Sequence, residues 1–146
     1  MNLTQDQIVF RKVTPQDYAA YRLIINDFRE TIFTEAQFQE TLRYCDAYSD
    51  IMVLEYQNRL IATATIVYER KFIFNICTLA HIEDVCVAPD FRKYGLGRVI
   101  VTKLVEMAKE KGCYKVTLDC ADHNVGFYEK CNFEKRGNQM TVYFGK

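Results

Sequence analysis

The hydrophobic pattern at the beginning of the chain predicts a strand and then a helix. Residues 8–13 (IVFRKV) alternate between apolar and polar side chains, which is typical of a β-strand. A helix over about 15–29 is expected next, because Thr14 can cap it, Pro15 suits its first position and Asp17 places an acid in its first turn. The apolar face of this helix contains Tyr18, Tyr21, Ile25 and Phe28.

A second helix and a hairpin are predicted to follow. Thr34 with Gln37 three residues later forms a capping box, which marks a helix start. Phe38, Leu42 and Cys45 then recur at helical spacing. Two β-rich runs, 50–56 (DIMVLEY) and 59–70 (RLIATATIVYER), are separated by two residues, Gln57 and Asn58, which suit a tight turn.

The second half of the chain alternates between strands and helices. Gly112 is a good helix stop after the amphipathic run that begins near Leu96. The predicted elements are a strand over 78–87 that ends before Pro89, a helix over 96–111, a strand over 114–120, a short helix over 124–131 and a closing strand over 139–144. The order is therefore β-α-α-β-β-β-α-β-α-β, and we expect residues 1–146 to form a single mixed α/β domain.

Composition and charge exclude several classes of protein. Of the 146 residues, 49% are hydrophobic and 26% are charged, as in ordinary globular domains. Lys+Arg and Asp+Glu both number 19, and this balance argues against a general nucleic-acid binder. No apolar run approaches the roughly 18 residues of a membrane span, and the start lacks the pattern of a signal peptide. We therefore expect a cytoplasmic protein, although an organelle is possible without a recognisable tag.

The cysteines do not suggest a metal site. They are Cys45, Cys77, Cys86, Cys113, Cys120 and Cys131. No two form a C-x-x-C pair, and His81 and His123 do not lie at zinc-finger offsets, so no structural metal is expected. Free thiols in a reducing compartment are the simplest interpretation.

The turn at 92–97 (RKYGLG) is the strongest candidate for a binding site. It precedes a helix, whose first N–H groups and partial positive charge attract phosphate groups. Two glycines allow close approach of the backbone, and Arg92, Lys93 and Arg98 add positive charge. The turn matches neither the Walker loop nor the dinucleotide fingerprint. A surface turn with solvated charges is the alternative interpretation.

The same turn resembles the R/Q-x-x-G-x-G/A motif of the GNAT superfamily of N-acetyltransferases, whose order of elements is similar as well. HIEDVCV, GCYKVTLDC and NVGFYEKCNF resemble the eukaryotic glucosamine 6-phosphate N-acetyltransferase family over about 70–140. The resemblance implies a mixed, mostly antiparallel twisted sheet flanked by helices. It also implies acetyl transfer from acetyl-CoA to the 2-amino group of glucosamine 6-phosphate, by direct attack in a ternary complex, in UDP-N-acetylglucosamine biosynthesis.

The resemblance also implies roles for individual residues. Asp119 would orient the acceptor amine and help to remove its proton, and Tyr128 would protonate the leaving thiolate, because a phenol keeps its proton at pH 7. Acetyl-CoA would be bound by Val85, Cys86, Val87, Arg92, Lys93, Tyr94, Gly95, Leu96, Gly97, Arg98, Asn124 and Tyr128. The sugar phosphate would be bound by Lys71, Glu83, Asp84, Tyr114, Lys115 and Asp119. No metal is implied.

Three further expectations concern the acceptor site. Glu83 and Asp84 are adjacent and would point to opposite faces of a regular strand, unless a bulge intervenes. The family often has histidine at the position of Phe74, and an arginine near the C-terminus where this chain reads MTVYFGK, so Arg136 is a candidate replacement. Family members are homodimers with a shared sugar site, and the resemblance implies the same here.

Other functions are compatible with part of the pattern. An acetyltransferase for a polyamine or a protein amine would use the same turn, but lysines around the site favour a phosphorylated sugar. A non-catalytic acyl-CoA-binding domain would not need Asp119 or Tyr128. A cysteine hydrolase built on Cys120 and His123 is disfavoured, because Asp119 and Asp122 would raise the pKa of the thiol.

Overall fold

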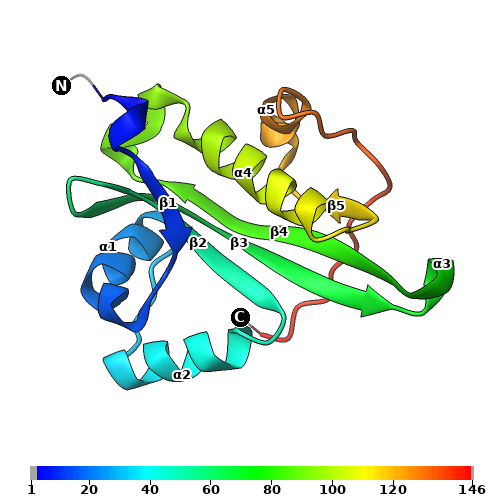
Figure 1. The fold of residues 1–146 in the computed structure, drawn as a ribbon, viewed down its shortest axis with the longest axis horizontal. Helices are drawn as coiled ribbons and strands as arrows, with labels where there is room; N and C mark the ends of the chain where they lie inside the picture. Colours follow the sequence, from blue (N-terminus) through cyan, green and yellow to red (C-terminus); the bar gives the residue numbers. More distant parts are fainter. Residues whose placement is uncertain (1–2, 146) are drawn as a thin grey trace.

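The computed structural model describes residues 3–145, and its centre is one sheet of five strands in sequence order (Figure 1). The strands are β1 (Val9–Lys12), β2 (Ser49–Tyr56), β3 (Arg59–Lys71), β4 (Cys77–Val87) and β5 (Lys115–Thr117). All neighbours are antiparallel except β4 and β5, which are parallel. The predicted mixed, mostly antiparallel sheet is confirmed.

Helices cover both faces of the sheet, but unequally. α4 (Leu96–Glu110) packs its apolar side, centred on Ile100 and Leu104, against Ile66 and Ile82 of the sheet. α1 (Tyr18–Phe28) and α2 (Glu35–Cys45) pack on the opposite face, over Val53. The β3–β4 hairpin extends beyond all of these helices, so its far end has no helical cover (Figure 1).

The local signals for α2 and for the β2–β3 hairpin are confirmed. Thr34 Oγ1 accepts from the Gln37 N–H at 3.1 Å, and Gln37 Oε1 accepts from the Thr34 N–H at 2.8 Å. Gln57 and Asn58 have φ values of 49° and 63°, as the tight turn between antiparallel strands requires. These features form from residues close in sequence, so sequence patterns are enough to predict them.

The first helix differs from its prediction in start and in burial. A 3-10 turn (Pro15–Asp17) precedes α1, which begins only at Tyr18. Ile24 is the buried residue at 2% exposure, whereas Phe28, expected on the buried face, is 45% exposed. A period of 3.6 residues allows either Ile24 or Ile25 to lie at the centre of the buried face. Packing of α1 against β3 and β4 buries Ile24.

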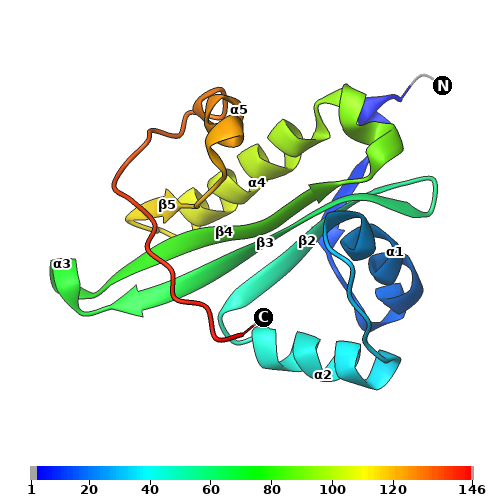
Figure 2. The ribbon, with the colours of Figure 1, turned by 180° about the vertical axis from the view of Figure 1, so that it is seen from behind.

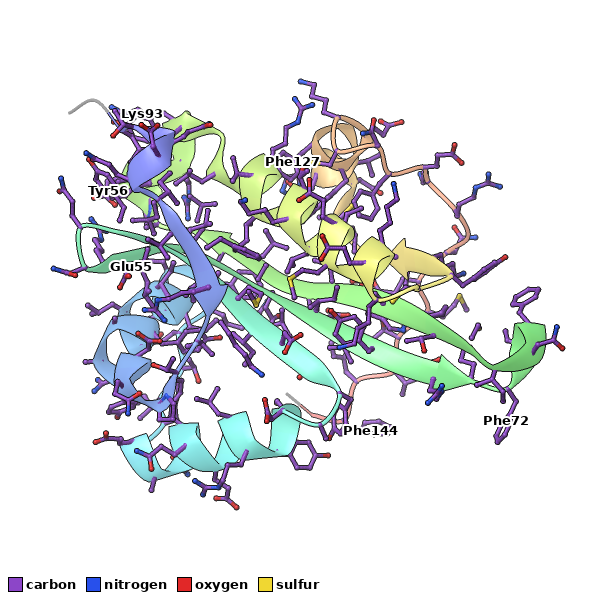
Figure 3. All side chains as sticks on the ribbon, in the orientation of Figure 1. Glu55, Tyr56, Phe72, Lys93, Phe127 and Phe144 are labelled. Carbon is purple, nitrogen blue, oxygen red and sulfur yellow. The ribbon has the colours of Figure 1, made fainter. Side chains whose placement is uncertain are left out.

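The tip of the β3–β4 hairpin is an unpredicted one-turn helix, α3 (Ile73–Ile76). Phe74 and Asn75 within it have left-handed backbone angles, with φ of 52° and 58°. Figure 3 shows Phe72 at this tip, directed away from the sheet, and its side chain is 91% exposed. The tip therefore presents apolar side chains to solvent.

The predicted closing strand over 139–144 was wrong. The described part of this segment has no regular structure, although its apolar residues alternate. Met140, Val142, Tyr143 and Phe144 are between 78% and 94% exposed. Figure 2 shows the segment passing across β5, β4 and β3 toward the end of α2. An extended segment becomes a strand only when another strand satisfies its backbone, and none does so within residues 3–145.

Candidate active site

The backbone of β4 has an open edge next to β5. The two strands pair only over Leu79–His81 and Lys115–Thr117, so the strand predicted over 114–120 ends at Thr117. β4 continues to Val87 and, among residues 3–145, pairs there with β3 alone. The N–H and C=O groups of Val85–Val87 that face away from β3 can therefore bind an extended amide chain in place of a strand.

A β-bulge reshapes β4 at its acidic pair. Thr63 and Thr65 of β3 pair with Cys86 and Glu83, so two residues on β4 lie opposite one on β3. Asp84, within the bulge, has a φ of 52°. Cys86 packs with the α1 core, and its Sγ lies 3.5 Å from the Ile24 carbonyl oxygen. The strict alternation of Glu83 and Asp84 is thus broken by the bulge.

The predicted anion-binding turn lies at the start of α4. Gly95 has a φ of 71° at the N-cap position, which is why glycine suits this point. Arg92 and Lys93 are exposed on the preceding 3-10 turn (Pro89–Tyr94), which carries Tyr94 as well, and Arg98 is exposed in the first turn of α4. The turn thus brings positive charge to the N-terminus of α4, a helix of fifteen residues.

Gly97 is required by the packing between α4 and α5 (Val125–Glu129). A Cβ at this position would lie 3.1 Å from Cζ of Phe127 and 3.8 Å from Cγ2 of Val87. Figure 3 shows Phe127 on α5 beside α4. The close approach joins the turn, the end of β4 and α5 into one site, with the helix-starting Leu96 fully buried beneath it.

Glu83, Asp119 and Tyr128 come from three different parts of the chain, and Asp119, two residues after β5, acts electrostatically on the other two. Burial raises the pKa of Tyr128 above its ordinary value, and the nearby Cys120, Cys131 and Asp119 raise it further. Burial also raises the pKa of Glu83, with Asp119 as the next largest cause. Asp119 therefore lies close enough to act electrostatically on both. A phenol with a raised pKa keeps its proton at neutral pH and can donate it.

The sheet face opposite α4 carries the charged residues expected to bind the acceptor. Because side chains alternate along a strand, Ala80 and Val116 face α4 while His81 and Lys115 face the other way. The open face, as we call it, consists of Glu69, Lys71, His81, Glu83, Lys115 and Thr117. α1 covers only the opposite end of this side of the sheet, so most of these side chains reach solvent.

Aromatic residues border the open face at the hairpin tip. The rings of Phe74 and Tyr114 stack with centroids 4.6 Å apart and an interplanar angle of 29°. Both rings remain more than half exposed, and the Tyr114 N–H donates to the Thr78 carbonyl at 2.8 Å. Tyr114 is thus fixed next to Lys115. Arg136 instead pairs with Glu134 at 2.8 Å and is largely exposed.

Two further observations concern Asn124 and metals. Asn124 occupies the N-cap position of α5, but its side chain makes no capping hydrogen bond, so capping does not explain it. Residues 3–145 contain no group of three or more His, Cys, Asp or Glu side chains that could hold a metal ion. In the same residues no helix has the length and apolar character needed to cross a membrane.

Sequence reasoning missed three residues near the site. Glu69 and His81 join Lys71 on the open face, and Tyr21 of α1 hydrogen-bonds to Thr63 beneath the bulge, where burial raises its pKa to about 12. The alternation along β3 and β4 places Glu69 and His81 on the face of Lys71 and Glu83, so this signal was available. No local signal identifies Tyr21, because its partners are more than 40 positions away.

The chain is similar to known acetyltransferases. The profile of the Acetyltransferase (GNAT) family matches residues 18–133. Glucosamine 6-phosphate N-acetyltransferase 1 of Dictyostelium discoideum is 36% identical over 148 residues, covering 97% of this chain and 94% of the relative. The crystal structure of glucosamine-6-phosphate N-acetyltransferase from Arabidopsis thaliana has a TM-score of 0.89 and 32% identity, covering 94% of this chain and 98% of that chain.

Proposed function

This chain belongs to the Acetyltransferase (GNAT) family, and we propose that it acetylates the 2-amino group of D-glucosamine 6-phosphate. The acetyl donor is acetyl-CoA, and the products are N-acetyl-D-glucosamine 6-phosphate and CoA. The observation that carries this proposal is the open edge of β4 at Val85–Val87, together with an acid, Asp119, that acts electrostatically on both Glu83 and Tyr128. The similarity to glucosamine 6-phosphate N-acetyltransferases over nearly the whole chain supports the acceptor.

The residues at the start of α4 and the end of β4 fit acetyl-CoA. The pantetheine arm is an extended amide chain, which the open backbone of Val85, Cys86 and Val87 can pair with. Its pyrophosphate suits the helix N-terminus at Gly95–Gly97, with Arg92, Lys93 and Arg98 nearby. Asn124 at the N-cap of α5 and Tyr128 within α5 complete this set. A backbone N–H at the bulge would serve as the oxyanion donor.

The remaining residues supply proton transfer and orientation. The attacking amine must be neutral, and Asp119 can accept a hydrogen bond from it and orient it. As the tetrahedral intermediate breaks down, the C–S bond breaks and Tyr128 gives its phenolic proton to the sulfur, while Asp119 helps to remove the extra proton from the nitrogen. Direct attack in a ternary complex needs no residue as nucleophile, which agrees with an Asp119–Tyr128 pair and leaves Cys120 without a catalytic role.

The open face fits a phosphorylated sugar. Lys71 and Lys115 provide positive charge for the phosphate, Tyr114 stands beside them, and Glu83 with Asp84 can bind sugar hydroxyls or the amine. An acidic face without lysines would instead suit a polyamine. The product would feed UDP-N-acetylglucosamine biosynthesis, which is the pathway we propose.

We also propose a homodimer whose subunits share the sugar site. The hairpin tip and the segment over 139–144 expose many apolar side chains, and exposed apolar patches mark interaction sites. Both border the open face of the sheet (Figure 2). A second copy that covers them would also enclose the acceptor.

The test is release of CoA from acetyl-CoA by the purified protein with a panel of acceptors. The panel contains glucosamine 6-phosphate, glucosamine, glucosamine 1-phosphate, spermidine and a lysine peptide. We expect a strong preference for glucosamine 6-phosphate. Tyr128→Phe should lower kcat by roughly 10²–10⁴-fold, as expected for loss of a general acid, and Asp119→Ala should abolish most activity.

The controls separate the acceptor from the mechanism. Tyr44→Phe removes an exposed phenol on α2 that has no proposed role in binding or proton transfer, and this variant should retain kcat. Release with another acceptor alone would refute the sugar assignment. Binding of acetyl-CoA without release for any acceptor would favour a non-catalytic acyl-CoA-binding domain.

A further inference from the structure

The open face contains one acidic residue that the proposed mechanism does not use, Glu69. Its carboxylate lies among the groups expected to bind the acceptor phosphate, where a negative charge repels a phosphate dianion. Glu69 Oε1 lies 3.2 Å from Nζ of Lys71, and Glu69 Oε2 lies 3.4 Å from Nε2 of His81. Each oxygen of the carboxylate therefore faces a different nitrogen.

Position along the strands explains this arrangement. Glu69 and Lys71 are two residues apart on β3, so both point to the open face, and Lys71 would otherwise rotate freely at the end of its strand. His81 lies on β4 opposite Val67, diagonally adjacent to Glu69. The carboxylate thus spans two neighbouring strands.

The environment of the three groups indicates a fixed arrangement. Their side chains are between 31% and 46% exposed, so each is partly shielded from solvent. Nε2 of His81 is itself shielded from solvent and, among the described residues, makes no hydrogen bond of good geometry. Glu69 is the acid that faces it. Hydrogen bonding to Lys71, with a smaller contribution from His81, lowers the pKa of Glu69, so the carboxylate is charged at neutral pH.

We infer that Glu69 is a positioning residue for acceptor recognition, which holds the Lys71 side chain on the His81 side of the open face and directs the Lys71 ammonium toward the acceptor phosphate. The inference rests on the proposed function, because it needs a phosphorylated acceptor on the open face. A flexible lysine loses side-chain entropy when it binds an anion. A lysine already held by Glu69 has lost part of that entropy beforehand, so binding the phosphate costs less free energy. Glu69 acts only through Lys71 and is not a catalytic residue.

The test compares Michaelis constants of Glu69→Ala, Lys71→Ala and the double variant. Lys71→Ala should raise KM for glucosamine 6-phosphate by roughly 10–100-fold, the effect of losing a charge-assisted hydrogen bond. Glu69→Ala should raise the same KM by about fivefold, the upper range for a partly exposed ion pair. The double variant should match Lys71→Ala. In each variant kcat and KM for acetyl-CoA should stay unchanged.

Glucosamine without phosphate and a second lysine–acid pair provide the controls. A merely structural role of Glu69 would change activity with both sugars, whereas positioning of Lys71 leaves activity with glucosamine unchanged. Asp46→Ala removes the same charge from an acid that pairs with Lys12 at the C-cap of α2 and does not belong to the open face, and it should leave every constant unchanged. His81→Gln keeps a side-chain N–H and should stay closer to wild type than His81→Leu. Thermal unfolding of each variant confirms that it is folded.

The outcomes distinguish this inference from the proposed function. Wild-type protein that does not acetylate glucosamine 6-phosphate overturns both. If the wild type is active but Glu69→Ala has an unchanged or lower KM, only the role of Glu69 is overturned. Its carboxylate would then have no effect on phosphate binding, or an unfavourable one. Additive effects in the double variant would show that Glu69 does not act through Lys71, which also overturns it.

Discussion

Asp17 is nearly buried, at 9% exposure, and its carboxylate accepts several hydrogen bonds at once. Both terminal nitrogens of Arg11 donate to it at 2.8 Å, and the Thr14 N–H donates at 2.7 Å. The hydrogen bond from Arg11 is the largest cause of a lowered pKa for Asp17. This single residue links β1 to the start of α1, which covers the bulge of β4.

Asp17→Asn should destabilise the protein at pH 7 by about 3 kcal/mol, the typical cost of breaking a buried pair. The folded-state pKa lies below the unfolded value of about 3.9, so the contribution is fully present above that pH. It is lost as pH falls through the folded-state pKa. Urea unfolding at pH 7 and pH 2.5 measures the free energy of unfolding of both proteins. The difference between wild type and variant should be smaller at pH 2.5.

Asp90→Asn is the matched control for this prediction. Asp90 also accepts from two nitrogens of one arginine, Arg59, at 2.7 and 2.8 Å, but it is 60% exposed. Solvent screens an exposed pair, so its loss should change stability much less. Equal losses for Asp17→Asn and Asp90→Asn would contradict the importance of burial.

At the scale of elements, one glycine flanks each end of α4, and both have left-handed backbone angles. Gly95 before α4 and Gly112 after it have φ of 71° and 77°, and neither has an atom within 4 Å of where a Cβ would lie. Substitution at either therefore acts through the backbone alone. Only Gly95 belongs to the turn proposed to bind the pyrophosphate of acetyl-CoA.

Gly95→Ala and Gly112→Ala should each cost about 1 kcal/mol of stability, because a left-handed backbone is unfavourable for alanine. Gly95→Ala should also raise the Kd for acetyl-CoA about tenfold, the effect of one or two misplaced hydrogen bonds. Gly112→Ala should leave that Kd unchanged. Urea unfolding and titration calorimetry measure both quantities. Equal effects of the two variants on the Kd for acetyl-CoA would show that the turn before α4 does not bind the acetyl donor.

At the scale of the whole molecule, the described chain leaves apolar surface at one side of the sheet. The hairpin tip exposes Phe72 and Ile73, and the C-terminal segment exposes Val142, Tyr143 and Phe144. Figure 3 shows Phe144 directed away from the sheet near the end of α2, far from Phe72 in the same view. A second copy of the chain is the proposed cover for both.

Deletion of residues 138–146 should convert dimers into monomers, because it removes most of this exposed apolar surface. Light scattering should give twice 17.1 kDa for wild type and about half that mass for the truncated protein. Leu23→Ser, which changes an exposed apolar residue on α1 outside the proposed interface, should remain dimeric. A dimer that survives the truncation would place the interface elsewhere.

The amino-acid sequence by itself determined the features whose partners are close in the chain. The Thr34–Gln37 capping box, the turn at Gln57–Asn58 and the helix stop at Gly112 depend on a few consecutive residues. The glycine-containing turn at 92–97 is equally local, so its position before a helix could be predicted from consecutive residues. Amphipathic periodicity gave the order of the helices and strands for the same reason.

Only the tertiary structure decided the features that depend on distant partners. The bulge at Asp84 and the end of β4–β5 pairing at Thr117 arise from registers between strands, which no local pattern contains. The electrostatic effect of Asp119 on Glu83 and Tyr128 likewise joins residues from different elements. Residues 139–144 alternate like a strand but form none, because a strand is defined by the backbone it pairs with and not by its own side chains.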